Sequence, residues 1–531
     1  MIAKRLAYAV GIGMIFLIFG SAFAEGPERG QLTEQEKRGK YIYLRGLSRS
    51  GKEVTCFLGD QTTEVPATAM LCASCHGFDG RGNPEGGVTP SDITWEALTK
   101  PYGVTHVSGR KHPAYTERTL EAALSKGIDP AGNRLPFTMP MYSMSREDLA
   151  DLVAYMKRLG RDLDPGLSDA SIKIGAILPG GAQSADLGLA VKAALGAYFA
   201  EINAQGGIYD RKIELRVADA AISPGEAKTS AERFIDQEQV FAMAAAFIAG
   251  ADKEIISLAE EKEVPVIGPF TLYPETGYPL NRHIFYLFSG LKEQGDVLVK
   301  FVAEKIQKQN ARIAIVCPDT ASAAEVAGSI EQECKKRGYN SISIIRYSRN
   351  QFDAAQLARK MSEANTEAVL SLAASQEMAA VMREGEKLKW TPYVLMPGAL
   401  AGKEILDAPQ SFKSKIFLSF PTLPSDQVPE ALSEYLALAE KHKLPPRHLA
   451  SQLSAYCAAR ILVEGLKLAG KELSREKLIK ALEGFYEFNT GLIPAITYGP
   501  NRRIGAVGAY IVAIDLEKKR YIPASGWLTP D

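Results

Sequence analysis

The chain has 531 residues, a length that normally divides into two or three domains, each with its own hydrophobic core. Its 62 lysine and arginine residues balance 62 aspartate and glutamate residues, so it lacks the broad positive field with which proteins bind nucleic acid or anionic membranes. No nucleic-acid partner is therefore expected. Six cysteines are too few to hold a chain of this length mainly by disulfides.

The N-terminal segment has the pattern of an export signal. Lys4 and Arg5 precede an apolar stretch over residues 6–19, and small residues at Ala22 and Ala24 fit a peptidase site. We expect a signal peptide over residues 1–24, cleaved after Ala24, and a periplasmic location. Because the apolar stretch is only slightly short for a membrane span, an uncleaved anchor is the alternative. No later segment has the apolar length of a membrane span.

Residues 25–160 form the first expected domain, which contains the one Cys-x-x-Cys-His motif of the chain, Cys72, Cys75 and His76. Two thiols three residues apart can add to the two vinyl groups of one haem, and the adjacent histidine then lies beneath the iron as its proximal ligand. A disulfide or half of a zinc site is the alternative, but no second cysteine pair lies nearby in the sequence to complete a zinc site. The motif therefore predicts one covalently attached haem c.

The residues around the motif resemble the class I cytochrome c family. A glycine-rich stretch over 77–82 follows the motif directly, and residues 135–142, Leu-Pro-Phe-Thr-Met-Pro-Met-Tyr, are similar to the family's Met-Pro loop. The resemblance implies a small all-α domain. It also implies that Met139 is the second axial ligand of the haem iron.

Other ligand assignments follow from the same resemblance or compete with it. In the family, a proline carbonyl accepts the hydrogen bond of the proximal histidine, and Pro90 is the match here, with Pro84 as the alternative. Met141 and Met144 compete with Met139 for the iron, but neither is followed by a proline.

The identity of the iron ligands decides what the haem can do. His106 and His112 would give a haem held by two histidines, but they lie in a polar stretch rich in glycine and proline and are expected in solvated loops. Iron held by His76 and Met139 has no open position for a substrate, which favours outer-sphere transfer of one electron over catalysis. We therefore do not expect an enzyme.

Helical patterns flank the haem motif. Residues 145–159 begin with a capping serine and place apolar side chains on one face, which should pack against the N-terminal helix that carries Tyr41 and Tyr43. Residues 44–71 separate that helix from the motif, whereas the family joins them almost directly. We expect this insert to form a small hairpin or loop over the haem edge.

A polar segment over 161–170 contains a Pro-Gly pair and is expected to be a linker. Over 171–531, short apolar strands alternate with amphipathic helices, which indicates parallel βαβ units. We expect strands at 172–178, 213–218, 264–268, 312–317, 368–372, 393–396 and 415–418. The pattern starts again after about residue 290. Two lobes are therefore expected, one over 171–290 with 417–500, the other over 291–416 with the C-terminal segment.

A helix-to-strand connection in this block carries a second resemblance. Residues 202–208, Ile-Asn-Ala-Gln-Gly-Gly-Ile, followed by Arg-Lys-Ile at 211–213 and by Asp219, are similar to the Leu/Ile/Val-binding proteins of branched-chain amino acid ABC transporters. The resemblance implies the two-lobed α/β fold of periplasmic binding proteins of type I, which closes on a small molecule in the cleft. An ABC permease is then a candidate partner.

The residues with which the family binds an amino acid ligand are not present at the matching positions of this sequence. Its serine-rich turn becomes Ala249-Gly250-Ala251, and its Pro-Ala-x-Thr segment becomes Pro-Phe-Thr-Leu over 269–272. Each lost hydrogen bond to a charged group removes roughly 1.5 to 3 kcal/mol, so tight binding of leucine-type amino acids is not expected. A small, weakly polar solute, such as an alcohol or an aromatic acid, is expected instead. The candidate cleft residues are Ser184, Phe270, Thr271, Tyr273, Ser322 and Ser375.

The cysteines outside the haem motif are expected to be buried. Cys317 and Cys334 either pair with each other or are separate buried side chains, which is the commoner behaviour of free cysteine. Cys56 and Cys457 have no obvious partner in the sequence. We expect both to be buried, because an exposed thiol is a liability in an oxidising compartment.

The two blocks together predict a periplasmic monohaem cytochrome that transfers one electron. It is coupled to a domain that captures a small ligand or docks a redox partner, and that partner is expected to be a dehydrogenase or another cytochrome. Two alternatives stay open. One is the binding component of an ABC-type uptake system for amino acids or related solutes, with an accessory haem; the other is a haem enzyme.

Overall fold

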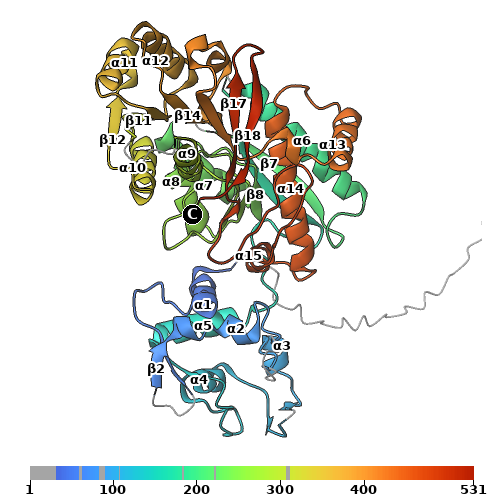
Figure 1. Ribbon diagram of the computed structural model, residues 1–531. Helices are drawn as coiled ribbons and strands as arrows, with labels where there is room; N and C mark the ends of the chain where they lie inside the picture. Colours follow the sequence, from blue (N-terminus) through green and yellow to red (C-terminus); the bar gives the residue numbers. More distant parts are fainter. Residues whose placement is uncertain are drawn as a thin grey trace, which may run out of the picture. The chain divides into compact units, whose positions relative to one another are not determined.

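The structure is a computed structural model that describes residues 32–58, 63–82, 90–106, 108–181, 184–220, 223–306 and 311–530. The chain divides into two compact units, Met1–Asp162 and Leu163–Asp531 (Figure 1). The predicted signal peptide lies outside the described residues. None of the helices in the described part of the chain combines the length and the apolar character needed to cross a membrane.

The first unit is built around two helices, α1 (Glu34–Arg45) and α5 (Arg146–Met156). They pack against each other, and the rings of Tyr43 and Tyr155 meet edge to face with their centroids 5.6 Å apart. Gly39 permits this close approach, because a Cβ there would lie 1.9 Å from the backbone oxygen of Asp151. The predicted packing between these two segments is confirmed. The shorter helices of the unit are α2 (Cys72–His76), α3 (Trp95–Leu98), α4 (Glu117–Lys126) and the 3-10 turn η1 (Ala67–Ala69).

The first unit also contains strands, so the prediction of an all-α domain is wrong. The strands are β1 (Thr55–Leu58), β2 (Thr63–Pro66), β3 (Val104–Thr105), β4 (Lys111–His112) and β5 (Met141–Ser143). β1 lies between β2 and β5 in an antiparallel sheet, and β3 pairs with β4. β1 and β2 form a hairpin within the predicted insert. Threonine, valine and phenylalanine side chains of the insert favour strands, and β5 gives the hairpin a third strand to pair with.

Most of the segment predicted as a linker belongs to the second unit. The carboxylate of Asp164 accepts a hydrogen bond from the backbone N–H of Arg475 at 2.6 Å. Leu167 is buried in the core of that unit and forms an isolated antiparallel bridge with Ile172. The division between the units therefore falls after Asp162, within the predicted linker over 161–170.

The first sheet of the second unit is parallel and has the strand order β16-β10-β9-β8-β6-β7. Its strands are β6 (Ser171–Leu178), β7 (Lys212–Asp219), β8 (Ala242–Ala244), β9 (Val266–Ile267), β10 (Ile284–Phe288) and β16 (Ile504–Ala506). Helices α6 and α14 share one apolar core with this sheet, and α7 and α8 share another. The helices associated with it are α6 (Ala185–Ala204), α7 (Pro224–Glu238), α8 (Asp252–Glu261), α13 (Pro429–Lys441), α14 (Leu449–Ala469) and α15 (Arg475–Glu483).

The second sheet has the order β12-β11-β13-β14-β15-β17-β18, in which only β17 and β18 run antiparallel to their neighbours. Its strands are β11 (Ile313–Pro318), β12 (Ile342–Tyr347), β13 (Ala368–Ser371), β14 (Tyr393–Pro397), β15 (Ile416–Phe420), β17 (Ala509–Asp515) and β18 (Arg520–Leu528). Helices α9 and α10 share one core with the sheet, and α11 and α12 share the other. Their bounds are α9 (Leu291–Ile306), α10 (Ala321–Lys336), α11 (Ala354–Glu363) and α12 (Ser375–Lys387). The 3-10 turns are η2 (Arg349–Gln351), η3 (Gly398–Leu400), η4 (Lys403–Asp407), η5 (Gln410–Phe412) and η6 (Pro424–Asp426).

The two sheets correspond to the two predicted lobes, with two corrections at the boundaries. β15 belongs to the second sheet, although residues from 417 onward were predicted in the first lobe. β16, at 504–506, returns to the first sheet beyond the predicted limit of 500. Both corrections have the same cause. The chain leaves a sheet only after it has completed a strand there, and each predicted boundary fell before the last strand of its segment.

The chain crosses between the two sheets after β10, after β15 and between β16 and β17. The Ser289 hydroxyl accepts a hydrogen bond from the Gly508 N–H at 2.8 Å and donates to the Ala506 carbonyl at 3.3 Å. The Gln294 amide donates to the Ser289 carbonyl at 3.0 Å and accepts from the Ser419 hydroxyl at 3.3 Å. Because these three side chains are buried, we call this group the crossing network.

The cysteines outside the haem motif are buried, as predicted. Cys56, Cys317, Cys334 and Cys457 are all free thiols, so the alternative pairing of Cys317 with Cys334 is not observed. Burial raises the pKa of the Cys334 and Cys457 thiols to about 12. These two thiols are therefore neutral at any physiological pH.

Candidate functional site

The Cys-x-x-Cys-His motif occupies a single helical turn, α2. Cys72 and His76 are buried, and Cys75 is exposed. Both thiols are free, and burial raises the pKa of the Cys72 thiol to about 11. The motif therefore presents two free thiols on one turn, directly followed by an imidazole.

Two tyrosine hydroxyls fix the ends of this turn. Tyr43 of α1 donates a hydrogen bond to the Gly77 carbonyl at 2.7 Å, just after the motif. Tyr142 of β5 donates to the Met70 carbonyl at 2.7 Å, just before it. Burial raises the pKa of both tyrosines, so both hydroxyls keep their protons and remain donors.

His76 is oriented by a hydrogen bond to a backbone carbonyl. Its Nδ1 lies 3.0 Å from the carbonyl oxygen of Ser91, which corrects the predicted acceptor, Pro90, by one residue. The carbonyl of Pro90 instead faces Gly82, where a Cβ would lie 2.3 Å from that oxygen. Pro84 lies outside the described residues. Burial lowers the pKa of His76, partly offset by the bond to Ser91, so the ring is neutral and its Nε2 is the nitrogen left for a metal.

The methionines of the predicted Met-Pro loop differ in their surroundings. Met139 is half-buried beside the core of the first unit, in a turn closed by its N–H donating to the Pro136 carbonyl at 2.9 Å. Met141 lies in β5, and its sulfur is 3.3 Å from the position that a Cβ on Gly127 would take. Met144 packs against the same core. Met141 is thus committed to the contact with the end of α4, and Met139 stays the predicted second ligand.

The side chains of the motif fit a covalently attached haem. The turn offers two thiols for the vinyl groups and one neutral imidazole for the iron. A zinc site would need further ligands. Within the described ranges, no group of three or more His, Cys, Asp or Glu side chains is arranged to hold a metal ion.

The six residues predicted for the ligand cleft lie at the carboxyl ends of strands in both sheets. Ser184, Phe270, Thr271 and Tyr273 follow strands of the first sheet, and Ser322 and Ser375 begin helices after strands of the second. Carboxyl ends of parallel strands are the usual ligand-binding edges of such sheets. The Ser375 hydroxyl donates to the Gly402 carbonyl at 3.3 Å and is therefore engaged within its own lobe.

Asp252, a residue that the sequence analysis missed, occupies the hydrogen-bond donors at the edge of the first sheet. Its carboxylate accepts from the Thr271 hydroxyl and from the Gly250 N–H, the latter at 2.9 Å. Thr271 in turn accepts from the Tyr273 N–H at 2.8 Å. Burial raises the pKa of Asp252, although these bonds oppose the rise. The sequence signal that could have identified Asp252 is its position as an acidic residue directly after the turn at 249–251.

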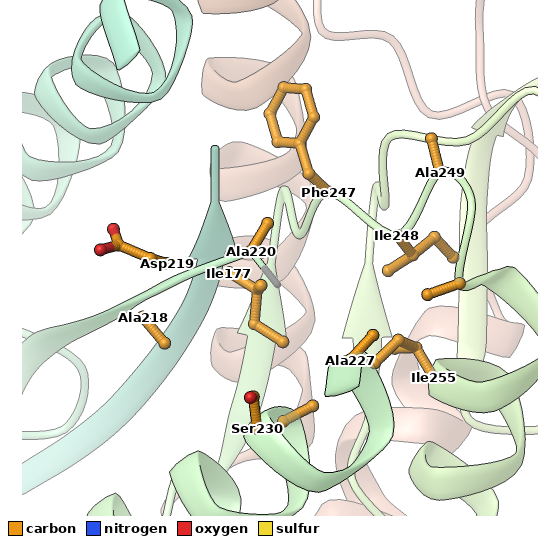
Figure 2. Close-up of a pocket in the computed structure, with 12 residues that line it drawn as sticks. Ile177, Ala218, Asp219, Ala220, Ala227, Ser230, Phe247, Ile248, Ala249 and Ile255 are labelled. Carbon is orange, nitrogen blue, oxygen red and sulfur yellow. The ribbon is translucent and has the colours of Figure 1, made fainter. Parts of the chain in front are cut away.

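A pocket opens at the carboxyl ends of β6, β7 and β8, between α7 and α8 (Figure 2). Its lining is mainly apolar and includes Ile177, Asp219, Ala220, Phe247, Ala249 and Ile255. Phe247 points away from Ile177 and Ala220 in Figure 2, and its ring stacks on Phe270 with centroids 4.3 Å apart. None of the six predicted cleft residues is among the described residues that line this pocket.

Family models match both units of the chain. The model described as periplasmic binding protein matches residues 171–520, and the model described as cytochrome c matches residues 66–160. A Leu/Ile/Val-binding protein homolog 8 from Brucella abortus (strain 2308) is 23% identical over 238 residues, which are 43% of this chain and 58% of that protein. Homolog 7 from the same strain is 23% identical over 316 residues, 56% of this chain and 77% of the relative. The chain thus spans little more than half the length of the first of these relatives.

Solved structures share the fold of the second unit. A fatty acid ABC transporter substrate-binding protein from Thermomonospora curvata has a TM-score of 0.55 at 19% identity, covering 69% of this chain and 94% of that one. A branched chain amino acid ABC transporter protein from Thermus thermophilus with bound valine has a TM-score of 0.55 at 17% identity, covering 68% and 97%. At these identities the likeness establishes the fold and carries no information on the ligand.

Proposed function

Because the chain belongs to the periplasmic binding protein family through residues 171–520 and carries a cytochrome c domain before them, we propose that it is a periplasmic one-electron carrier coupled to solute capture. The observation that carries this proposal is the geometry of α2. Cys72 and Cys75 share one turn, and the imidazole of His76 is held through Nδ1 by the Ser91 carbonyl.

In this proposal, Cys72 and Cys75 would hold one haem c, and His76 and Met139 would ligate its iron. The bound haem supplies reversible one-electron chemistry. The Ser91 carbonyl fixes the His76 tautomer and directs Nε2 toward the metal. With both His76 and Met139 ligating the iron, a substrate would find no open position, and the chain would act as a carrier instead of a catalyst. A dehydrogenase or another cytochrome in the periplasm is the redox partner.

Export of the full chain from a host that matures c-type cytochromes tests this assignment. We expect colour that acid-acetone does not extract from the native protein and that extraction removes from the Cys72→Ala, Cys75→Ala double variant. The reduced spectrum should not change with carbon monoxide, whereas Met139→Ala should respond to it. Met144→Ala is the matched control and should behave as the native protein does. A colourless matured protein, or a native protein that binds carbon monoxide readily, would contradict the assignment.

For the second unit, we infer a small, weakly polar solute such as an alcohol, and neither an aromatic acid nor a free amino acid. Asp252 supports this, because its carboxylate already takes the Thr271 hydroxyl and the Gly250 N–H at the edge of the first sheet. The stacked rings of Phe247 and Phe270 give the same edge an apolar surface. Delivery of the solute to an ABC permease is the second candidate role, which the family match favours.

Calorimetry and thermal shift separate these possibilities. Leucine and valine should give no measurable heat at micromolar concentrations. In a screen of periplasmic solutes, alcohols should raise the unfolding temperature of the second unit, because a ligand that binds only the folded state stabilises it. Micromolar affinity for leucine would overturn the proposed ligand class and favour an amino acid uptake receptor.

A further inference from the structure

Two histidines of the first unit belong to a buried polar group that the electron-carrier proposal does not use. His106 and His112 flank the β3–β4 turn, and their Nε2 atoms lie 2.9 Å apart. Arg110 approaches the same Nε2 of His106 at 2.9 Å, and its other terminal nitrogen donates to the carboxylate of Asp129 at 2.7 Å. His112 is only 6% exposed, so it is not the solvated loop histidine that the sequence predicted, whereas His106 is half-buried.

This group is connected to the haem ligand through one residue. The Ser91 hydroxyl lies 3.3 Å from Nδ1 of His106, and the Ser91 carbonyl lies 3.0 Å from Nδ1 of His76. A change of charge on His106 or His112 is therefore felt at the axial ligand through a short, partly buried path, where screening by water is weak.

When both imidazole rings are neutral, the pair lacks the proton that a hydrogen bond between the two Nε2 atoms requires. His112 Nδ1 faces the Pro113 carbonyl at 2.8 Å, and an acceptor of that kind requires a proton on Nδ1. Arg110 can only donate, so its contact requires a lone pair on His106 Nε2. Two neutral rings then bring two lone pairs together at 2.9 Å. One added proton on His112 Nε2 turns this close approach into a hydrogen bond to His106 Nε2, whose single lone pair is then shared between His112 and Arg110.

The groups around the pair shift the pKa of His106 in opposite directions. Burial and the positive charge of Arg110 lower the pKa of His106, while the negative charge of Asp129 acts in the opposite sense. Asp129 stays ionised because hydrogen bonds from Asn133 and Arg110 outweigh the effect of its burial and lower its pKa. Tyr115, whose ring lies 4.9 Å from that of His112, stays neutral because burial raises its pKa.

We propose that the His106–His112 pair is a proton site coupled to the haem electron, taking up a proton when the haem is reduced and releasing it on oxidation. This inference rests on the proposed electron-carrier function. Reduction removes one positive charge from the iron, which favours a positive charge on the nearby pair. The redox partner supplies the electron and solvent supplies the proton, so charge and mass balance without another reactant. The chain then moves a proton together with each electron.

Spectroelectrochemical titration of the full-length haem protein between pH 5 and 8 tests the coupling. The midpoint potential should fall as pH rises, approaching at most 59 mV per tenfold change in proton activity, the limit for one proton and one electron. His112→Gln and His106→Gln, which cannot titrate, should flatten this slope. His442→Gln in the second unit is the matched control and should keep it. A reversible one-electron wave with a flat slope would overturn the coupling and leave the carrier function intact, whereas absence of the wave would overturn the carrier function itself.

A second measurement protects the test from variants that fold poorly. Reduction of the native protein in weakly buffered solution near neutral pH should take up a measurable fraction of one proton per electron, read from a pH indicator. No uptake would overturn the proposal without any variant. A slope that persists unchanged in correctly folded His112→Gln would assign the proton to the haem carboxylates and would also overturn it.

Discussion

At the scale of single residues, Asp252 distinguishes this ligand edge from one that binds carboxylates. A backbone N–H and a hydroxyl at the carboxyl ends of two strands would ordinarily be free to hold an anionic group. Here both are bonded to the side chain of Asp252, so neither of these two donors is available to an incoming carboxylate. The residue therefore acts against one class of ligand instead of recognising another.

Asp252→Ala should reverse that selection. The Thr271 hydroxyl and the Gly250 N–H become available, so we expect affinity for small carboxylates to rise at least tenfold over the native protein, measured by calorimetry with leucine and benzoate. Glu254→Ala, on the same helix, is the control and should leave both affinities unchanged. Equal affinities in the native protein and the Asp252 variant would show that the carboxylate does not decide the ligand class.

The predictability of the site also differs residue by residue. Cys72, Cys75 and His76 could be recognised because covalent attachment requires a fixed spacing within one helical turn. The acceptor for His76 was placed one residue away, because which carbonyl faces the ring depends on how the chain passes Gly82. Asp252 could not be found by pattern at all, since its partner Thr271 lies 19 residues further along the chain.

At the scale of secondary structure, the length and the apolar pattern of each strand decided whether it could be predicted from the sequence. The predicted strands coincide with β6, β7, β9, β11, β13, β14 and β15. Most of them are apolar runs, and β7 alternates apolar with polar side chains. β8 has only three residues, and β12 is an edge strand with alternating exposure, so neither stood out in the sequence. In the first unit, β1 and β2 form a hairpin within the insert that was predicted to be a small hairpin or loop, whereas β3, β4 and β5 were missed because the family resemblance implied helices alone.

The packing of α1 on α5 depends on the absence of a side chain at position 39. In Gly39→Ala the new methyl group would overlap the Asp151 carbonyl, so the helices must separate. We expect a loss of about 1 to 3 kcal/mol in the unfolding free energy of the first unit, measured by urea titration of the haem absorbance. Gly196→Ala, in α6 with nothing within 4 Å of the new Cβ, is the control and should not destabilise its own unit. Equal effects of the two substitutions would contradict this account.

The contact between α9 and α10 should make the stability of the second unit depend on pH. Burial, with the negative charges of Glu333 and Glu293, raises the pKa of Asp296 to about 7, and its buried Oδ1 has no hydrogen-bond partner among the described residues. The folded state therefore binds a proton that the unfolded chain releases above its ordinary pKa near 4. The stabilisation is complete below that value and is lost as pH rises to 7, by at most about 1.4 kcal/mol per pH unit.

Asp296→Asn removes the ionisable group and keeps the shape of the side chain. The variant should unfold at a higher temperature than the native protein at pH 8, and the difference should shrink toward pH 4, followed by intrinsic fluorescence. Glu304→Gln, an exposed position on α9, provides the comparison and should follow the native profile. A pH profile of Asp296→Asn identical to that of the native protein would remove Asp296 as its source.

At the scale of the whole chain, the two units combine different chemistry in one polypeptide. The cytochrome c unit presents a haem motif held by tyrosines from α1 and β5, and the binding unit presents two sheets whose carboxyl edges carry the candidate ligand contacts. Within the binding unit, the crossing network joins all three segments that connect the lobes. The hydrogen bonds of Ser289 therefore lie where the lobes are connected, and we expect a change in the angle between the lobes to alter them.

Ser289→Ala tests the energetic weight of that network. It leaves the buried N–H of Gly508 without its acceptor, which should cost about 1 to 3 kcal/mol in the unfolding free energy of the second unit, measured in urea by intrinsic fluorescence. The haem spectrum should be unchanged, because the substitution lies outside the first unit. Ser454→Ala, whose hydroxyl bonds within its own exposed helical turn, is the control with a small expected effect. A negligible cost for Ser289→Ala would mean that another group replaces the lost acceptor.

The order of the strands also bears on how the protein is made. Both sheets of the binding unit contain strands from 504–528, because β16 pairs beside β10, and β17 with β18 extend the second sheet. A nascent chain cannot finish either sheet until that stretch has left the ribosome, and pairings between such distant residues form slowly. A polypeptide that must be threaded through a translocation channel before it folds gains time from this arrangement.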